Sequence, residues 1–302
     1  MCKGSLQTVS TSAASTASSL SAPTDAGQKI PSGFYRNRRL IEIGLLILSV
    51  LYGSIYYINP DIPVNPILCS DVVLDAACRR PDLLAYKAVA IVCMMTMGLI
   101  GVYNWHFTSE FKRLGSKSAT PEERLFGQIK ASEYLNVVIF CYQLWDFVVS
   151  LTIPEHMDAV FLVHHLLALL TAYCSLEYQM VAYYSIFYGG CSEFSSIFLI
   201  FLDKHKVIPV PEGSFLEIWI QTCQIMFFLT FSYYRIYGWI GYSFPLWRDC
   251  QAVIDSGSAE KHRPGKTYFL RVFQGLDFTL GALQCFWYYK ILETVANMAA
   301  GQ

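Results

Sequence analysis

Charged residues are scarce in this sequence. Only 15% of its 302 residues are Asp, Glu, Lys or Arg, whereas an ordinary soluble domain carries about 25%. The net charge is −1, so the composition gives no global signal for binding nucleic acid or an acidic substrate. We therefore expect no nucleic-acid partner.

Paired-cysteine motifs are also absent. The chain has ten cysteines but no CxxC, which argues against a zinc ribbon or a thioredoxin-like site. Most of the cysteines stand singly in apolar runs and are typical of small core residues, and neither a metal site nor a cofactor is evident. Cys69 and Cys78 fall together in a predicted loop, where an oxidising compartment would allow a disulfide; free thiols are equally compatible with the sequence.

The N-terminal region has no apolar segment of the kind that a cleavable secretory signal requires. Residues 1–39 are rich in Ser, Thr and Ala, and we predict a disordered cytosolic tail. A transit peptide is the alternative, because Asp25 is the one acidic residue of this segment. Without a cleavable signal, the first apolar block is expected to act as a signal anchor.

Long apolar blocks dominate the rest of the chain. Hydrophobic residues make up 54% of it, and a bilayer core about 30 Å thick needs about 20 apolar residues per helix. The blocks predict an all-α, multi-pass transmembrane bundle of about seven spans. These spans are Leu40–Ile58, Leu84–Phe107, Ser132–Ile153, Met157–Leu176, Met180–Leu202, Ser214–Phe244 and Thr267–Thr294.

The predicted spans divide the chain into regions. Two spans and a lumenal loop occupy residues 40–129, a helical core occupies 130–294, and a short tail occupies 295–302. Most Lys and Arg residues near the span ends fall on the side of the N-terminus, which favours a cytosolic N-terminus. The short turns between the third, fourth and fifth spans predict a tight antiparallel cluster of those helices.

Ionisable side chains inside the spans are costly and usually face the bundle interior. They are Asp146 in the third span, His164 and His165 in the fourth, Glu193 in the fifth and Asp277 in the seventh. Counting residues from the intervening turns places Asp146 and the histidines at matching depth, with Glu193 about one helical turn away. We therefore expect the first four to converge on one intramembrane pocket, which Asp277 would join only if its depth agrees.

The candidate roles follow from chemistry. Asp146 would fix the tautomer of a histidine, and His164 or His165 would act as general base or substrate anchor; a purely structural polar network is the alternative. Adjacent histidines on a helix point about 100° apart, so their spacing does not indicate a metal clamp. Arg235 falls near the end of the sixth span and is expected to be an interfacial anchor. The candidate lipid-binding residues are Tyr142, Glu193, Ser195 and Asp277.

These polar residues lie in an ordered set of motifs. The chain reads "CYQLWDFVVS", "FLVHHLLALL", "GGCSEFSSIFL", "FSYYRIYGW" and "LQCFWYYKI" in that order. Together, from about Lys130 to Glu293, these stretches resemble the TLC family, the TRAM–Lag1–CLN8 domain. The resemblance implies a multi-pass endomembrane protein, most simply of the endoplasmic reticulum, with a role in lipid metabolism or lipid homeostasis.

The branch of the family is a further expectation. Ceramide synthases of this family transfer a fatty acyl group from acyl-CoA to a sphingoid base, and they carry clustered aspartates after the paired histidines. Here the corresponding helix, "FYGGCSEFSSIFLIFLD", has Glu193 and a lone Asp203, so the chain looks more like the TLC-domain-containing branch. The fatty-acid elongase box H-x-x-H-H is broken, since Phe161 stands at its first histidine.

Three functions remain open on this basis. The first is lipid homeostasis through binding of a lipid or acyl chain, which makes membrane lipids the expected partners. The second is an acyltransferase with acyl-CoA as co-substrate and the His–His/Asp site as its machinery; cytosolic Lys112 and Arg113 would then steer the CoA phosphates. The third is a structural or translocation-associated role, as in the TRAM branch.

Overall fold

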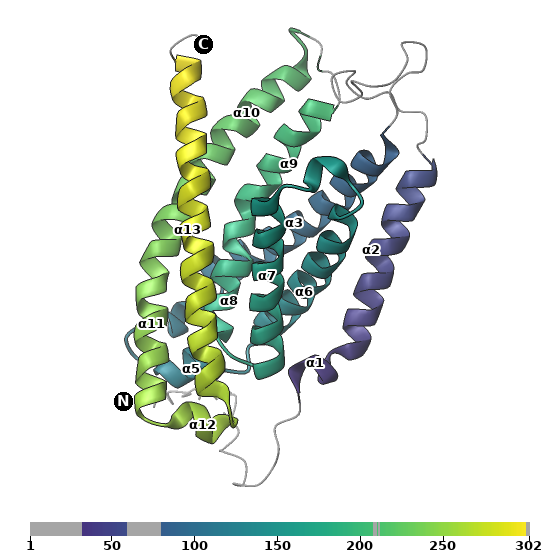
Figure 1. Cartoon of the computed structure of the whole chain (residues 1–302). Coiled ribbons are helices and arrows are strands. Elements are labelled where there is room, and N and C mark those ends of the chain that lie inside the picture. Colours follow the sequence, from purple (N-terminus) through teal and green to yellow (C-terminus); the bar gives the residue numbers. More distant parts are fainter. Residues whose placement is uncertain (1–31, 59–79, 208–209, 211, 300–302) are drawn as a thin grey trace, which may run out of the picture. The chain divides into compact units, whose positions relative to one another are not determined.

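The computed structural model describes residues 32–58, 80–207, 210 and 212–299. Within these ranges the chain is largely helical and contains no strand, which confirms the predicted all-α class. The described residues all belong to one unit, Pro31–Gln302. Its long helices run side by side (Figure 1).

Five helical stretches among the described residues are long and apolar enough to cross a membrane. They are α2 (Arg38–Ile58), α3 (Pro81–Phe107), α7 (Ala159–Tyr178), the run Ala182–Asp203 and the run Phe215–Asp255. The fourth is formed by α8 (Ala182–Gly189), the 3₁₀ turn η3 (Cys191–Glu193) and most of α9 (Phe194–Val207). The multi-pass architecture is thereby confirmed.

The predicted third and seventh spans are also long helices, α6 (Lys130–Ser150) and α13 (Lys266–Ala299). Neither is among the five apolar stretches. In α6 the polar residues Asn136, Gln143 and Asp146 interrupt the apolar sequence, and all three are buried. Because α6 packs against α2, α3, α7 and α8, its polar face meets protein. The count of seven spans stays a prediction.

The chain begins its first helix earlier than we predicted. Helix α1 (Gly33–Arg36) lies inside the segment 1–39, for which the sequence predicts a disordered tail, and Ser32 caps the helix by accepting a hydrogen bond from the Tyr35 amide at 3.1 Å. The Phe34 ring packs edge-on against Phe140 of α6, at 5.3 Å between centroids. This aromatic contact ties α1 to the bundle.

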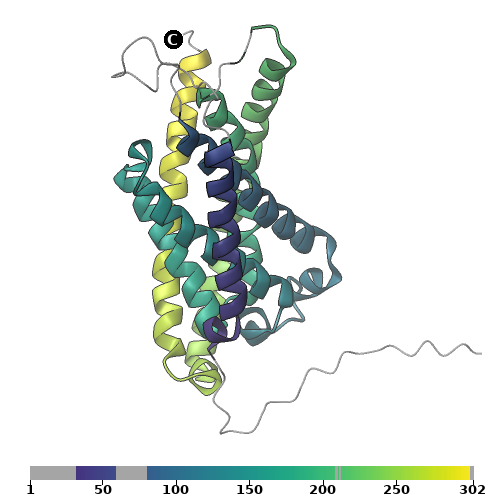
Figure 2. The same ribbon diagram turned by 90° about the vertical axis from the view of Figure 1, so that its right-hand side faces the viewer.

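Helix α3 is central, since it contacts α2, α6, α8 and α9, whereas α2 lies on the outside of the bundle (Figures 1 and 2). The approach of α3 to the fifth predicted span is very close. A Cβ atom on Gly101 would lie 2.2 Å from the carbonyl carbon of Gly190. Small residues permit such contacts between membrane helices, so glycine is required on both sides.

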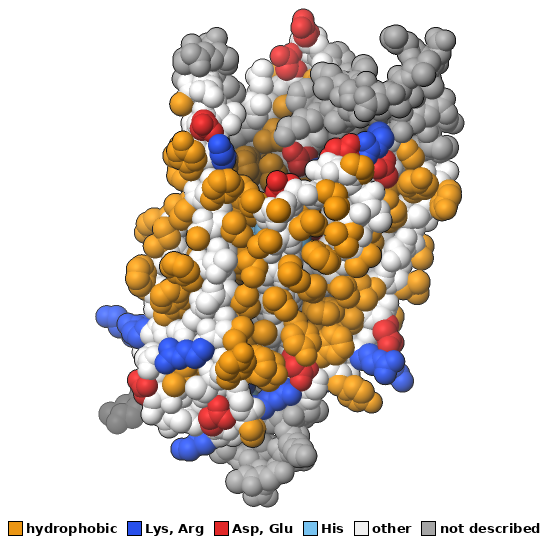
Figure 3. All heavy atoms as spheres, in the orientation of Figure 1, with side chains coloured by type: hydrophobic (Ala, Val, Ile, Leu, Met, Phe, Trp, Pro, Cys, Tyr) orange, Lys and Arg blue, Asp and Glu red, His pale blue; other side chains and the backbone are white. Residues whose placement is uncertain are grey.

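Short helices gather at one end of the bundle, which we call the closed end: α4 (Ser109–Leu114), α5 (Pro121–Phe126), α12 (Ser258–His262) and the turn at residues 179–181. Lys and Arg side chains are frequent at this end (Figure 3). The opposite end, the open end, carries the start of α3 and the 3₁₀ turn η2 (Pro154–His156). Which end faces the cytosol stays a prediction, and Cys69 and Cys78 lie outside the described residues.

The predicted sixth span is one continuous helical run with an irregular centre. Helix α10 (Phe215–Thr230) passes into a π-helix, η4 (Phe231–Gly238), which continues as α11 (Trp239–Asp255). A π turn widens the helix and changes the direction in which later side chains point, and such turns are frequent at functional sites. Arg235 lies within it.

Candidate functional site

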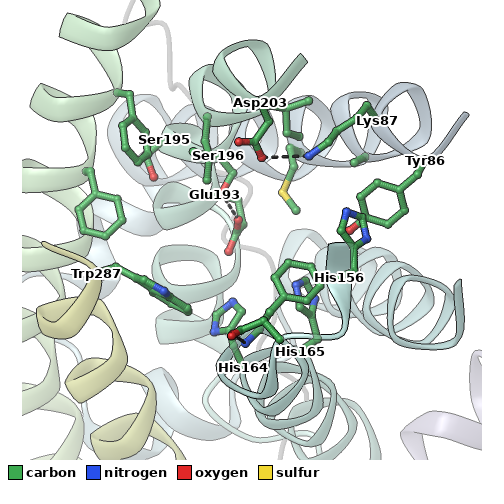
Figure 4. Close-up of a pocket in the computed structure, with 18 of the residues that line it drawn as sticks. Tyr86, Lys87, His156, His164, His165, Glu193, Ser195, Ser196, Asp203 and Trp287 are labelled. Atoms are coloured by element: carbon green, nitrogen blue, oxygen red, sulfur yellow. Dashed lines mark hydrogen bonds and ion pairs between the residues drawn. The ribbon is translucent and has the colours of Figure 1, made fainter. Parts of the chain in front are cut away.

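A cavity of about 750 Å³ opens between α3, α7, α9, η4 and α13. Its walls are mainly apolar, and its inner end, the cavity floor, is polar: Tyr142, Gln143, His164, His165, Glu193 and Arg235. Charged side chains from the open end form the cavity rim: Lys87, Glu155, Asp158, Asp203 and Lys290. Figure 4 shows Lys87 and Asp203 on one side and the two histidines on the other, with Glu193 between them.

His165 is the histidine that is held by a carboxylate. Its Nδ1 atom lies 2.8 Å from Gln143 Oε1 and in contact with Asp146 Oδ2. Asp146 is fully buried, and its other oxygen accepts a hydrogen bond from the Tyr86 hydroxyl. The Gln143 Oε1 atom can only accept a hydrogen bond, so the proton of a neutral His165 ring resides on Nδ1, with the carboxylate of Asp146 beside it. Its Nε2 atom is then left with a free lone pair.

This arrangement follows from the local sequence. Gln143 and Asp146 are three residues apart on α6, so both present their side chains to the same face. Helix α7 packs against that face, and η2 joins the two helices with a short turn. The structure thus brings Asp146 and His165 together, as the depth count predicted.

His164 has different surroundings. Its ring packs edge-on against Trp287 of α13, with 4.8 Å between centroids, and 5.2 Å separates it from the His165 ring. Its Nδ1 atom is buried and has no hydrogen-bond partner among the described residues. The two adjacent histidines are therefore not equivalent.

Glu193 is paired with a cation, Arg235. Arg235 is only 6% exposed, and its Nη2 atom donates to Glu193 Oε2 at 2.9 Å and to Ser196 Oγ at 2.8 Å. Its Nε donates to Ser195 Oγ at 2.9 Å, and Nη1 donates to Gln284 Oε1 at 3.1 Å. The expectation that Arg235 anchors the interface is therefore wrong. A buried guanidinium with this many acceptors is compensated within the protein.

The remaining predicted site residues divide into two groups. Tyr142 and Ser195 both line the cavity, and both are buried. Asp277 is absent from the described lining of the cavity. It accepts a hydrogen bond from Trp247 Nε1 at 2.8 Å instead. The structure does not bring Asp277 to the site.

Four residues that line the cavity were not predicted as site residues from the sequence: Tyr86, Gln143, His156 and Arg235. Gln143 had a usable signal, because it shares a helix face with Asp146. His156 lies in the turn η2, with its ring 4.3 Å from that of Tyr86. Burial, and secondarily the charge of Lys87, lowers its pKa to about 4, so His156 is neutral at physiological pH.

Ion pairs organise the rim. Lys87 Nζ lies 2.9 Å from Asp203 Oδ2, and Arg80 pairs with both Asp82 and Glu155. The hydrogen bond from Arg80 lowers the pKa of Glu155. The rim therefore presents charges of both signs around the mouth of the cavity.

Comparison with known protein families gives one match. The sequence profile of the TLC domain matches residues 84–293, more than half of the chain. This chain belongs to the TLC domain family. The TLC domain match starts at Leu84, well before the resemblance that we recognised from Lys130 onward, and it includes every residue of the cavity floor. No curated protein and no solved structure matches the chain.

Membership of the TLC domain family and the apolar helices together make this an integral membrane protein with a lipid-related role. The lining of the cavity is consistent with that class of ligand. A pocket of 300–1,000 Å³ with apolar walls and a few convergent polar groups is typical of small-molecule sites.

Proposed function

We propose that the protein acts in lipid homeostasis by binding a membrane lipid or acyl chain in the cavity, with a polar group of the ligand at the cavity floor. The main support is the contrast between apolar walls and polar floor. Ala90, Met94, Leu199 and Ile291 line the walls and suit a hydrocarbon chain. The methyl end of a hydrocarbon chain would make no favourable contact with Glu193 or Arg235. A polar group of the ligand is therefore expected to face these two residues.

The test uses two neighbouring positions on α13. Ile291 lines the cavity, whereas Leu292 is 43% exposed and is not among the lining residues. We would purify the wild type, Ile291→Trp and Leu292→Trp in mild detergent and identify retained lipids by native mass spectrometry. Only Ile291→Trp should lose a lipid class that the wild type enriches over the bulk membrane. No enrichment in the wild type, or equal retention by all three proteins, would reject the proposal.

A second candidate function is acyl transfer, favoured by the Tyr86–Asp146–His165 arrangement. A hydroxyl or amine acceptor would bond to the acyl carbon of acyl-CoA while His165 Nε2 takes its proton. The C–S bond of the thioester would break, and the proton would pass to the departing thiolate. Asp146 would stabilise the imidazolium in between.

The arrangement also bears on how acyl-CoA would approach. Lys112 and Arg113 lie on α4 at the closed end, away from the mouth of the cavity, so they are poorly placed to steer CoA phosphates into it. Lys87 and Lys290 at the rim are better placed. Acyl-CoA as co-substrate thus remains part of this second candidate only.

Activity in membranes tests the assignment of the base. His165→Ala and Asp146→Asn should each lower acyl transfer, the histidine variant by about 10²- to 10⁴-fold. His164→Ala should lower it less, because His164 makes no contact with Asp146. Each variant needs a melting curve to show that it folds. Equal loss in His164→Ala and His165→Ala would exclude His165 as the specific base.

A further inference from the structure

A second, smaller cavity of about 60 Å³ lies next to the first. The two share three residues, Gln143, His164 and Glu193. We call this small cavity the chamber. It is otherwise lined by apolar residues and by five polar ones: Asn136, Thr171, Ser175, Ser185 and Gln284. It is therefore a mainly apolar space that carries several polar groups, on the far side of His164 from the rim.

The chamber follows one face of α7. His164, Thr171 and Ser175 are separated by seven and four residues, which places them on the same side of a helix. From His164 to Ser175 the helix rises about 16 Å, and Ser175 lies close to the end of α7 at Tyr178. The polar lining thus leads from the middle of the bundle toward the closed end.

The polar groups of the chamber retain unused hydrogen-bonding capacity. Thr171 Oγ1 donates to the Leu167 carbonyl at 2.8 Å and Ser175 Oγ donates to the Thr171 carbonyl at 2.9 Å, so each hydroxyl oxygen can still accept. Asn136 Nδ2 lies 3.5 Å from Ser185 Oγ, at the outer limit for a hydrogen bond. His164 Nδ1 is buried without a partner among the described residues.

Space and polarity together indicate water. A water molecule occupies about 30 Å³ in the liquid and is stable in a cavity that offers it two to four polar partners. The chamber has room for about two and offers hydroxyl, amide and imidazole groups. An apolar ligand is disfavoured there, because it would leave those groups without partners.

We infer that the chamber holds ordered water and is the route by which water reaches His164 from the side away from the rim. A chain bound in the large cavity would cover the histidines from the rim side; this part rests on the proposed function. The chamber approaches His164 from the other side and stays open when the cavity is filled. The water site itself requires no ligand.

The test measures how fast the hydrogen on ring carbon Cε1 of each histidine exchanges in D₂O, read by fragmentation mass spectrometry of protein in phosphatidylcholine vesicles. This exchange needs water at the ring. Ile291→Trp narrows the large cavity without any ligand, and Thr171→Val/Asn136→Leu removes two of the polar groups of the chamber at nearly constant volume. Thr222→Val is the matched control, because the Thr222 hydroxyl also bonds a helix carbonyl, at 2.8 Å, but is exposed on α10.

We expect Ile291→Trp alone to slow His165 but not His164. Adding Thr171→Val/Asn136→Leu should slow His164 at least tenfold further and leave His165 unchanged, while adding Thr222→Val should change neither. If His164 is already slow in Ile291→Trp, or is as fast in the triple variant as in Ile291→Trp, the chamber is not its route. Neither result depends on whether the wild type retains a lipid.

Folding of the multiple variant is checked by a milder one. Ile291→Trp/Thr171→Val removes a single hydroxyl from the chamber and should slow His164 by an intermediate factor; an unchanged rate there would also count against the route. A high-resolution density map of the wild type should show ordered water between His164 Nδ1 and Thr171 Oγ1. An empty chamber in such a map would overturn the proposal.

Discussion

At the closed end, one carboxylate is paired inside tightly packed protein, whereas at the open end charged side chains surround a cavity. Asp249, which is 1% exposed, receives hydrogen bonds from Arg124 and from the Tyr184 hydroxyl, the latter at 2.6 Å. The rim pair of Lys87 and Asp203 is more accessible, with side-chain exposures of 13% and 31%. One end is built for rigidity and the other for access.

The difference places the site at a boundary. The residues of the cavity floor lie between the tightly packed half of the bundle, toward the closed end, and the half that contains the cavity, toward the open end. Their positions are therefore fixed from one side, while a ligand can reach them from the other. Such preorganisation is what binding and catalysis require of polar groups. Substitutions should therefore cost much stability in the packed half and little in the hollow half.

The largest expected effect comes from the contact between α3 and α8. Gly101→Ala would place a Cβ atom 2.2 Å from the carbonyl carbon of Gly190, and two backbones cannot yield as a flexible side chain can. We expect a loss of at least about 4 kcal/mol, seen as failure to elute as a monodisperse peak. Gly53→Ala on α2 is the matched control: nothing lies within 4 Å of its Cβ, and it should be neutral or slightly stabilising.

The next effect compares the two ion pairs. Asp249→Ala leaves Arg124 without its carboxylate and Tyr184 without its acceptor, and breaking a buried pair in this way costs about 3–5 kcal/mol. Asp203→Ala at the rim should cost about 1 kcal/mol or less, since water can solvate Lys87. Melting temperatures in detergent check both. Similar losses in the two variants would contradict the distinction between the ends.

A smaller effect is expected from truncating one leucine in each half. Leu246 of α11 is fully buried, whereas Leu199 of α9 lines the cavity and is 37% exposed. Leu246→Ala should cost about 2–5 kcal/mol, as large-to-small changes in cores do. Leu199→Ala enlarges a space that already exists and should cost less than about 1 kcal/mol. Equal melting temperatures for the two variants would show that the cavity walls are packed as tightly as the core.

Much of this architecture could be predicted from the sequence, because apolar length and residue depth are simple one-dimensional quantities. The positions of the long helices followed from the apolar blocks, and the approach of Asp146 to the histidines followed from counting 1.5 Å per residue from the short turn between their helices. Asp277 was harder. It lies on a 34-residue helix with no short turn linking it to α6 or α7, so nothing fixed its depth relative to the other carboxylates.

Arg235 could not be placed because its direction depends on a π turn, which regular helical periodicity does not anticipate. Its carboxylate partner, Glu193, was instead assigned to the histidines. The conformation of the turn after α7 could not be predicted from the sequence either. Gln179 and Val181 both adopt positive φ, 47° and 56°, and positive φ is usually found at glycine. Tertiary packing imposes both features.

The last prediction concerns a cation in the closed end that precedes the seventh predicted span. Lys266 is fully buried; its Nζ contacts His262 Nδ1 at 2.9 Å and the Gln179 carbonyl at 3.3 Å, and it lies 4.1 Å from the centroid of the Phe126 ring. Burial, with a smaller contribution from the charge of Arg263, lowers the pKa of Lys266 to about 7. An unfolded chain would titrate this lysine near 10.4.

Between these two pKa values the unfolded state binds more protons than the folded state, so stability rises with pH. Lys266 should contribute a gain on the order of 2 kcal/mol from pH 7 to pH 9. Lys266→Met removes the titration, so it should be more stable than the wild type at pH 7 and should lose this slope. Melting temperatures from about pH 7.5 to 9 test it. Burial lowers the pKa of His262 to about 4, whereas an unfolded histidine titrates near 6.5, so the slope from His262 lies below about pH 7.5 and outside the tested range. A wild-type slope that survives in Lys266→Met would mean that another group titrates, and that the closed end accommodates a charged lysine after all.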